Sequence, residues 1–299
     1  MVGRRLGRLG NCLVGACLVA AGAVAVGTGP AGATKPPPVY YLSLGDSLAQ
    51  GVQPNKTGAS VETSRGYTDD LYNQYRRQIP GLLPEKIGCP GESTTTMITG
   101  GICTYTEGVT ESDPLGNQLA QAESFLAHNH VAFVTIDIGA NDIDGCVGGG
   151  GIDPTCFANG LTAAATNLPV ILSGLQAAAP GVPIYAMNYY DPFLFAWVLG
   201  PQGQALATAS VSLGVEFNNA IDAAYAAAGV PVADVQDAFE TTNFTPQPAP
   251  TSLPINVQLI CGWTWMCTAP PRGPNIHADR AGYSAIATAF ETTIGYHPA

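Results

Sequence analysis

The chain has 299 residues, of which 46% are hydrophobic and 11% are charged, and its formal net charge is −11 at pH 7. This length suits one large domain with a buried core, and the composition excludes a disordered or fibrous protein. The acidic balance leaves no basic surface that could follow a phosphate backbone, so we expect no nucleic acid partner.

The N-terminus carries the features of a secretory signal. Three arginines lie within the first ten residues, an apolar run covers 11–27, and Ala31-Gly32-Ala33 has the small-x-small pattern of a cleavage site. We therefore predict a signal peptide at 1–33, a proline-rich linker at 34–38 and a secreted protein. The residues before Cys17 loosely resemble a lipoprotein box, which leaves lipidation as an alternative. No later stretch is expected to reach the ~18 apolar residues that a membrane span needs, so we expect no stable membrane insertion.

Strand-like and helix-like segments alternate along the rest of the chain. Short, mostly apolar segments predict strands at 39–44, 82–87, 131–138, 183–187 and 231–235. Segments rich in Ala, Leu and Gln predict helices at 67–77, 115–127, 161–179, 202–228 and 279–294. This alternation indicates an α/β fold, in which a parallel sheet is covered by helices on both faces and functional residues follow the carboxyl ends of the strands.

Six cysteines remain once the leader is removed, and all of them lie between the predicted helices and strands. An even number in a secreted chain predicts three disulfides. Six cysteines allow fifteen pairings, and the short separations favour 89–103, 146–156 and 261–267. None of these separations has the Cys-x-x-Cys form of a zinc site, so we expect no metal. The cysteines are Cys89, Cys103, Cys146, Cys156, Cys261 and Cys267.

Four polar motifs follow predicted strands or precede the last helix. Gly45-Asp46-Ser47-Leu48 follows the first strand, Gly91 follows the second, and Asn141 follows the third within a Gly-Ala-Asn-Asp sequence. His277 lies directly before the last helix. Each motif alone is also an ordinary turn. Together they supply a hydroxyl nucleophile, donors for an oxyanion and a base of near-neutral pKa.

In order and position, these motifs resemble the SGNH/GDSL hydrolase family, and the resemblance covers residues 39–295. It implies a flavodoxin-like three-layer fold of about five parallel strands, in a hydrolase domain over 39–299, that works without cofactor or metal. It also implies that Ser47 is the nucleophile and His277 the base. The implied oxyanion hole consists of the Ser47 and Gly91 backbone N–H groups and the Asn141 side chain. The short-range cysteine pairs and residues 188–193 are similar to secreted bacterial esterases and lipases of this family.

One position departs from the family pattern. An Asp often lies three residues before the catalytic His, and this chain has Pro274 there. We predict a Ser-His dyad in which the main chain orients His277. The side chains of Asn275 and Asp279 are alternatives, although the spacing of Asp279 fits a helix cap better.

Other residues are given structural roles. His128, His130 and His297 have no acidic or cysteine partners in the sequence, and Asp46 and Asp142 are expected to stabilise turns.

Several roles stay open. Glu92 is not assigned, and the apolar run 189–199 could line an acyl pocket or form a buried connection. The same two roles are open for Trp263 and Trp265.

The expected activity is hydrolysis of carboxylic esters, of lipids or other acyl compounds, through an acyl-Ser47 intermediate. Two alternatives share the fold: a carbohydrate deacetylase, and a secreted binding module without turnover. The expected partner is a small-molecule or lipid ester substrate, and we expect the protein to be a monomer.

Overall fold

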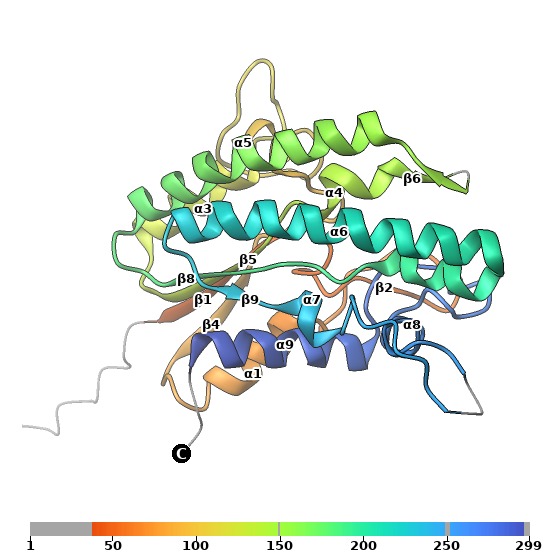
Figure 1. The fold of residues 1–299 in the computed structure, drawn as a ribbon. Coiled ribbons are helices and arrows are strands. Elements are labelled where there is room, and N and C mark those ends of the chain that lie inside the picture. Colours follow the sequence, from red (N-terminus) through yellow and green to blue (C-terminus); the bar gives the residue numbers. More distant parts are fainter. Residues whose placement is uncertain (1–37, 149, 249–251, 296–299) are drawn as a thin grey trace, which may run out of the picture. The chain divides into compact units, whose positions relative to one another are not determined.

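Five parallel strands form the central sheet of this computed structural model, which describes residues 38–148, 150–248 and 252–295. These residues belong to one compact unit. The signal peptide predicted at 1–33 and most of the linker lie outside the described residues. The sheet has the order β4-β1-β5-β8-β9, and every neighbouring pair is parallel (Figure 1). The strands are β1 (Val39–Gly45), β4 (Leu82–Lys86), β5 (Val131–Asp137), β8 (Ile184–Met187) and β9 (Val232–Ala233).

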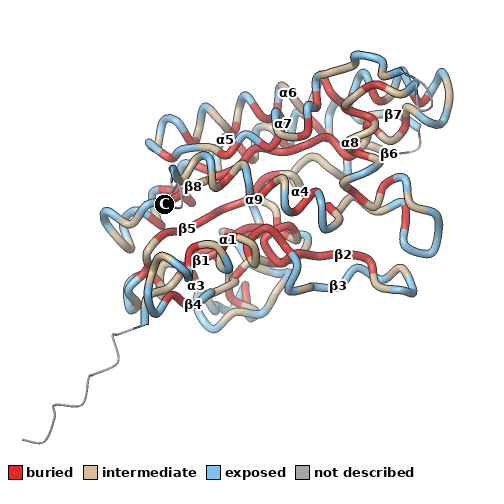
Figure 2. The backbone as a smooth tube through the Cα atoms, turned by 90° about the horizontal axis from the view of Figure 1, so that it is seen from below, coloured by how far each residue is buried: buried red, intermediate tan, exposed pale blue. Residues whose placement is uncertain are grey.

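Helices cover both faces of this sheet, as the sequence predicts (Figure 1). On one face α5 contacts both α3 and α6, and on the other α1 contacts α9. The central strands β1 and β5 are near-continuously buried, because both of their faces pack against helices, whereas the edge strand β4 is partly exposed. Figure 2 shows this buried backbone running through the centre of the molecule. The covering helices are α1 (Tyr67–Tyr75), α3 (Gln118–His128), α5 (Pro154–Ala178), α6 (Pro201–Ala227) and α9 (Arg280–Ile294).

Several segments expected to be loops contain short helices or strands. In α2, the Ser93 side chain accepts a hydrogen bond from the Thr96 N–H and so caps a threonine-rich segment of weak helix propensity. The helix α5 begins seven residues earlier than predicted, because Asp153 caps it and Pro154 suits its first turn. The remaining short elements are α2 (Thr94–Thr99), α4 (Ala140–Ile143), η1 (Asp144–Cys146), η2 (Pro192–Leu199), α7 (Val235–Ala238), α8 (Ile255–Trp263), and the hairpins β2 (Gln53–Pro54) with β3 (Ser60–Val61) and β6 (Val147–Gly148) with β7 (Gly151–Ile152).

The helix α5 also corrects an expectation about membranes. Among the described residues it is long and apolar enough, by length and composition, to cross a membrane, although we expected no such stretch after the leader. Its side chains at Leu168, Ile171 and Leu172 are fully buried, and the helix contacts α2, α3 and α6. One face of the helix thus belongs to the layer that covers the sheet, while 28% of its apolar window is buried.

Three disulfides join neighbouring cysteines in the sequence. They are the expected short-range pairs, Cys89–Cys103, Cys146–Cys156 and Cys261–Cys267. The first closes the segment that carries Gly91, the second ties η1 to α5, and the third ties the end of α8 to the loop before His277.

Removal of the Cys89–Cys103 bond should lower the free energy of unfolding by about 3 kcal/mol, because its loss frees the unfolded chain. The bond spans 14 residues, whereas Cys261–Cys267 spans 6, for which the same relation gives about 2 kcal/mol. Urea unfolding of the two Cys→Ser double variants measures both losses. A larger loss for the shorter loop would contradict the chain-entropy explanation.

Candidate active site

Ser47 lies in a tight turn directly after β1. Gly45, the last residue of the strand, has φ +128°, and a Cβ there would overlap the backbone carbonyl of Asp137 on β5. Only glycine fits this crossing of two strands. The Asp46 carboxylate accepts a hydrogen bond from the Leu48 N–H at 2.8 Å, which closes the turn around Ser47 as predicted.

A second carboxyl lies beneath the turn. Asp137 is fully buried and accepts hydrogen bonds from the Tyr67 hydroxyl (2.7 Å) and the Ala49 N–H (3.0 Å). Burial raises the pKa of Asp46 to about 6 and the pKa of Asp137 well above its usual value. A hydrogen bond joins the two carboxyls, and the charge of Asp46 adds to burial in raising the pKa of Asp137. This pair fixes the nucleophile turn to β5, and no local pattern in the sequence indicates it.

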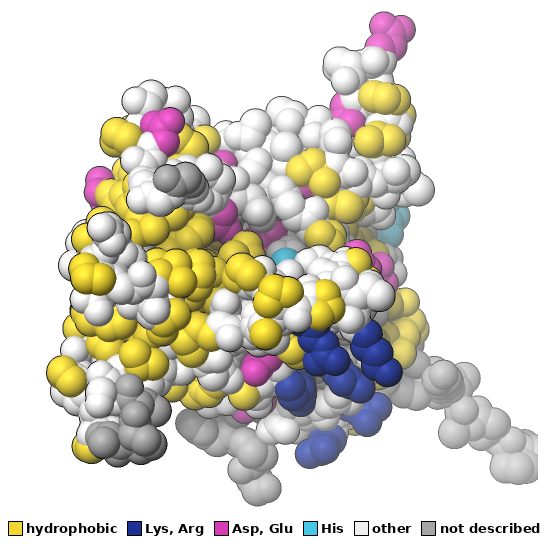
Figure 3. Space-filling model, turned by 90° about the vertical axis from the view of Figure 1, so that its right-hand side faces the viewer, with side chains coloured by type: hydrophobic (Ala, Val, Ile, Leu, Met, Phe, Trp, Pro, Cys, Tyr) yellow, Lys and Arg dark blue, Asp and Glu magenta, His cyan; other side chains and the backbone are white. Residues whose placement is uncertain are grey.

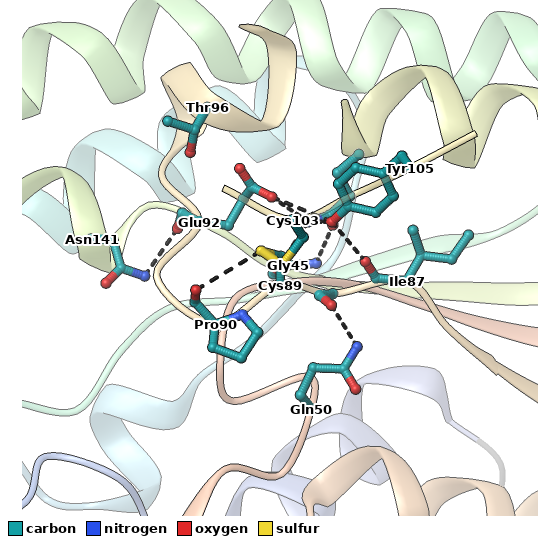
Figure 4. The surroundings of a disulfide bond; sticks show 12 residues. Gly45, Gln50, Ile87, Cys89, Pro90, Glu92, Thr96, Cys103, Tyr105 and Asn141 are labelled. Atoms are coloured by element: carbon teal, nitrogen blue, oxygen red, sulfur yellow. Dashed lines mark hydrogen bonds between the residues drawn. A yellow bond between two sulfur atoms is a disulfide. The ribbon is translucent and has the colours of Figure 1, made fainter. Parts of the chain in front are cut away.

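Asn141 lies in the first turn of α4, shortly after β5, and beside the loop that follows β4. Its amide donates a hydrogen bond to the Glu92 carbonyl at 2.9 Å (Figure 4). That bond uses one of the two amide hydrogens, and Asn141 also lines the pocket described below. The second hydrogen is therefore available for an oxyanion.

Gln118 joins the loop of Glu92 to the turn of Ser47, and no sequence motif indicates this role. Its amide accepts a hydrogen bond from the Gly45 N–H (2.7 Å) and donates to the Gly45 carbonyl (2.9 Å) and the Glu92 carboxylate (3.1 Å). Tyr105 adds a hydrogen bond to the same carboxylate at 3.4 Å. Glu92, left open from the sequence, is thus a buried residue that joins the loops around the site (Figure 4).

The two backbone donors expected in the oxyanion hole are free of protein partners. Within the described residues, the N–H groups of Ser47 and Gly91 donate no hydrogen bond to any backbone or side-chain acceptor. Gly91 has φ +87° and is exposed, and it is not one of the residues that line the pocket. Its role in the oxyanion hole stays a prediction.

His277 is oriented by Asn275, and the prediction that the main chain does so is wrong. The Asn275 Oδ1 lies 2.7 Å from the His277 Nδ1 and also accepts a hydrogen bond from the His277 backbone N–H at 3.1 Å. A backbone N–H only donates, so the atom it contacts is the amide oxygen. The oxygen then requires a proton on Nδ1 and leaves Nε2 unprotonated, as a base must be.

The surroundings of this pair keep the imidazole neutral. Burial lowers the pKa of His277 to about 4. The Asn275 Nδ2 donates to the Ser60 hydroxyl at 3.0 Å, which holds the amide in place. Asp279 caps α9 by accepting hydrogen bonds from the N–H groups of Ala281 and Gly282, so it serves the helix and not the imidazole.

Ser47, Asn141 and His277 line one pocket at the carboxyl ends of β1, β5 and β8. Figure 3 looks onto this edge and shows a histidine and acidic side chains in a hollow beside a broad hydrophobic surface. The pocket wall is mainly apolar and aromatic, and no Lys or Arg of the described part of the chain contributes to it. Its apolar members include Ile143, Val147, Ile152, Phe157, Tyr189, Tyr190, Phe193, Leu213 and Phe217.

Residues 189–199 do not all have the same role: part of this segment lines the pocket and part does not. Residues 189–193 line the pocket, whereas Leu194 and Ala196 are buried and Leu199 is exposed. Trp263 and Trp265 are not among the pocket residues, and Trp263 packs edge-to-face against Phe239.

Of the residues expected to be structural, Asp46 lines the pocket, whereas His128, His130 and Asp142 are not among its lining residues. His128 and His130 are exposed, and His297 lies outside the described residues. The Asp142 carboxylate accepts hydrogen bonds from the backbone and hydroxyl of Thr94, which anchors α2.

Comparison with known proteins adds a family and a fold. The family described as GDSL-like Lipase/Acylhydrolase matches residues 43–285. No curated protein matches the chain. Phospholipase A1 from Streptomyces albidoflavus NA297 is 18% identical with a TM-score of 0.53, over 85% of this chain and 98% of that one. An extracellular lipase from Streptomyces rimosus is 15% identical with a TM-score of 0.51, over 85% and 99% of the two chains. At these identities the two structures show a shared fold.

Proposed function

The chain belongs to the GDSL-like lipase/acylhydrolase family and is a carboxylic ester hydrolase, and on this basis we propose that it is a secreted enzyme that cleaves acyl esters through an acylated Ser47. The observation that carries this proposal is the convergence of Ser47, Asn141 and His277 on one apolar pocket. The predicted leader and the three disulfides support secretion.

In the proposed mechanism, the His277 Nε2 takes the proton of the Ser47 hydroxyl while the serine oxygen attacks the ester carbonyl. Asn141 and the free N–H groups of Ser47 and Gly91 receive the oxyanion. His277 then returns its proton to the leaving alcohol, and a water activated by the same imidazole releases the acid. Asn275 holds the imidazole in the required tautomer throughout.

The form of the pocket favours acyl esters over acetylated carbohydrate. A carbohydrate deacetylase is expected to have a shallow polar cleft, whereas this pocket is walled by Phe157, Phe193, Leu213 and Phe217. Each methylene of an acyl chain that is buried against apolar walls makes binding more favourable by about 0.8 kcal/mol.

Steady-state hydrolysis of a chain-length series of nitrophenyl esters tests the proposal. We expect kcat/KM to rise with acyl length until the pocket is filled, and Ser47→Ala to lower kcat by about 10⁴-fold or more. Ser112→Ala, which removes an exposed serine from a loop, is the matched control and should keep full activity. Activity that survives in Ser47→Ala would show that another group performs the reaction.

A further inference from the structure

One carboxyl group in the pocket has no partner. Asp144 begins η1, three residues after Asn141, and lines the pocket together with Ser47. Within the described residues no side chain or backbone N–H donates a hydrogen bond to its carboxyl, and no basic group forms an ion pair with it. Burial raises the pKa of Asp144 to about 8, with smaller contributions from the charges of Asp46 and Asp191. With this raised pKa the carboxyl is largely protonated at neutral pH, and a bound cation would stabilise its charged form.

Two further polar groups on the same wall lack partners. The Tyr189 hydroxyl and the Thr241 Oγ1 are buried without a hydrogen bond, and the two residues are 7% and 1% exposed. Both residues line the pocket. Because an unsatisfied buried polar group costs about 1–3 kcal/mol, these two groups, in the same pocket lining as the unpaired Asp144 carboxyl, indicate a place for a polar ligand group.

The chemistry of the wall indicates which group this is. Among the described residues, those that line the pocket include Asp46, Asp144 and Asp191 and no Lys or Arg. The carboxyls of Asp46 and Asp191 are held by hydrogen bonds within the protein, which leaves the Asp144 carboxyl for a ligand, and no Lys or Arg is there to attract an anion. A cation would meet this carboxyl and the aromatic rings of Tyr190 and Phe193, and aromatic faces attract organic ammonium groups.

We propose that this pocket recognises an ammonium group on the substrate, and that Asp144 is the specificity-determining residue that contacts it. The inference rests on the proposed ester hydrolysis and deepens it: the preferred esters carry a compact amine or quaternary ammonium. The ammonium pairs with the Asp144 carboxylate, while Ser47 attacks the ester carbonyl of the same molecule.

Two pairs of esters that differ only in charge test this. The first pair is butyrylcholine and 3,3-dimethylbutyl butyrate, in which a neutral carbon replaces the ammonium nitrogen of the alcohol. The second places the charge in the acyl part: the methyl esters of 4-(trimethylammonio)butyrate and of 5,5-dimethylhexanoate. We expect the wild type to favour the cationic member of at least one pair by about 10-fold or more in kcat/KM.

Asp144→Asn should reduce this ratio to near 1, because it removes the charge that selects the cation, and an unchanged unfolding temperature reports correct folding of the variant. Glu62→Gln removes one negative charge from an exposed position and should keep the preference. Equal rates within both pairs, or a preference that survives in Asp144→Asn, would overturn the inference while Ser47-dependent hydrolysis of the neutral esters upholds the proposed function. Without that hydrolysis, the proposed function fails and this inference with it.

Discussion

Asn275→Asp should move the acid limb of the pH profile of kcat/KM upward by about 1–3 pH units. In the wild type, burial lowers the pKa of His277 to about 4 and the only side chain at its Nδ1 is a neutral amide. The imidazole is therefore ready to accept a proton above about pH 4, and the activity of the wild type should persist into mildly acidic solution. A carboxylate at the same position favours the imidazolium and raises the pKa of His277 by about 1–3 units.

The direction of the change in activity depends on which protonation state of His277 is active. Neutral imidazole is the base, so a higher pKa means that more enzyme is protonated and inactive at pH 5, while at pH 8 the carboxylate stabilises the imidazolium formed during the reaction. Asn275→Asp should thus lose activity at pH 5 and keep or gain it at pH 8.

Asn275→Ala is the matched control for this experiment. It removes the acceptor at Nδ1 without adding charge, so it should lower kcat by about 10- to 100-fold at every pH, as expected for a lost hydrogen bond of about 1.5–3 kcal/mol. An acid limb that stays in place in Asn275→Asp would show that His277 is not the group that titrates.

Asn141→Ala should lower kcat by about 10²- to 10³-fold with little change in KM. The reason is that an oxyanion donor stabilises charge that develops only in the transition state, which is worth about 3–4 kcal/mol. Steady-state kinetics with one nitrophenyl ester gives both constants.

Asn141 also holds the Glu92 carbonyl, so a structural effect must be separated from loss of the donor. Gln118→Ala provides the comparison, since it breaks the bonds between Gly45 and Glu92 at a fully buried residue that does not line the pocket. It should lower the unfolding temperature and reduce kcat less than Asn141→Ala does. A loss in Asn141→Ala below tenfold would remove Asn141 from the oxyanion hole.

The sheet and its covering helices could be predicted from the sequence because their signals are local. The segments that form β1 and β5 are mostly apolar on both faces, which is typical of strands in a sheet buried on both faces. The short helices escaped prediction because caps determine them. In α2, for example, Ser93 and Thr96 bond to each other in a segment with no hydrophobic period.

Some features of the site could be predicted in the same way, and others could not. The placement of Ser47 and His277 in one pocket could be predicted, because each lies at the end of a regular element. The pairs Asp46 with Asp137 and Gln118 with Gly45 join residues about 70 or more positions apart, and nothing in the neighbourhood of either residue reveals its partner.

Asn275 is a different case. The sequence shows that Asn275 lies two residues before His277. Whether its side chain or a main-chain carbonyl reaches the His277 Nδ1 depends on the fold of the 265–275 loop. There the Trp265 backbone bonds both to the Asn275 N–H and to the His277 carbonyl.

Covalent labelling is a direct test of whether Ser47 is the nucleophile. The wild type is treated with a fluorophosphonate, digested, and the modified peptide is sequenced by mass spectrometry. We predict a single adduct on Ser47, slower labelling in His277→Ala and none in Ser47→Ala. An adduct on any other residue, or labelling of Ser47→Ala at the wild-type rate, would show that Ser47 is not the nucleophile.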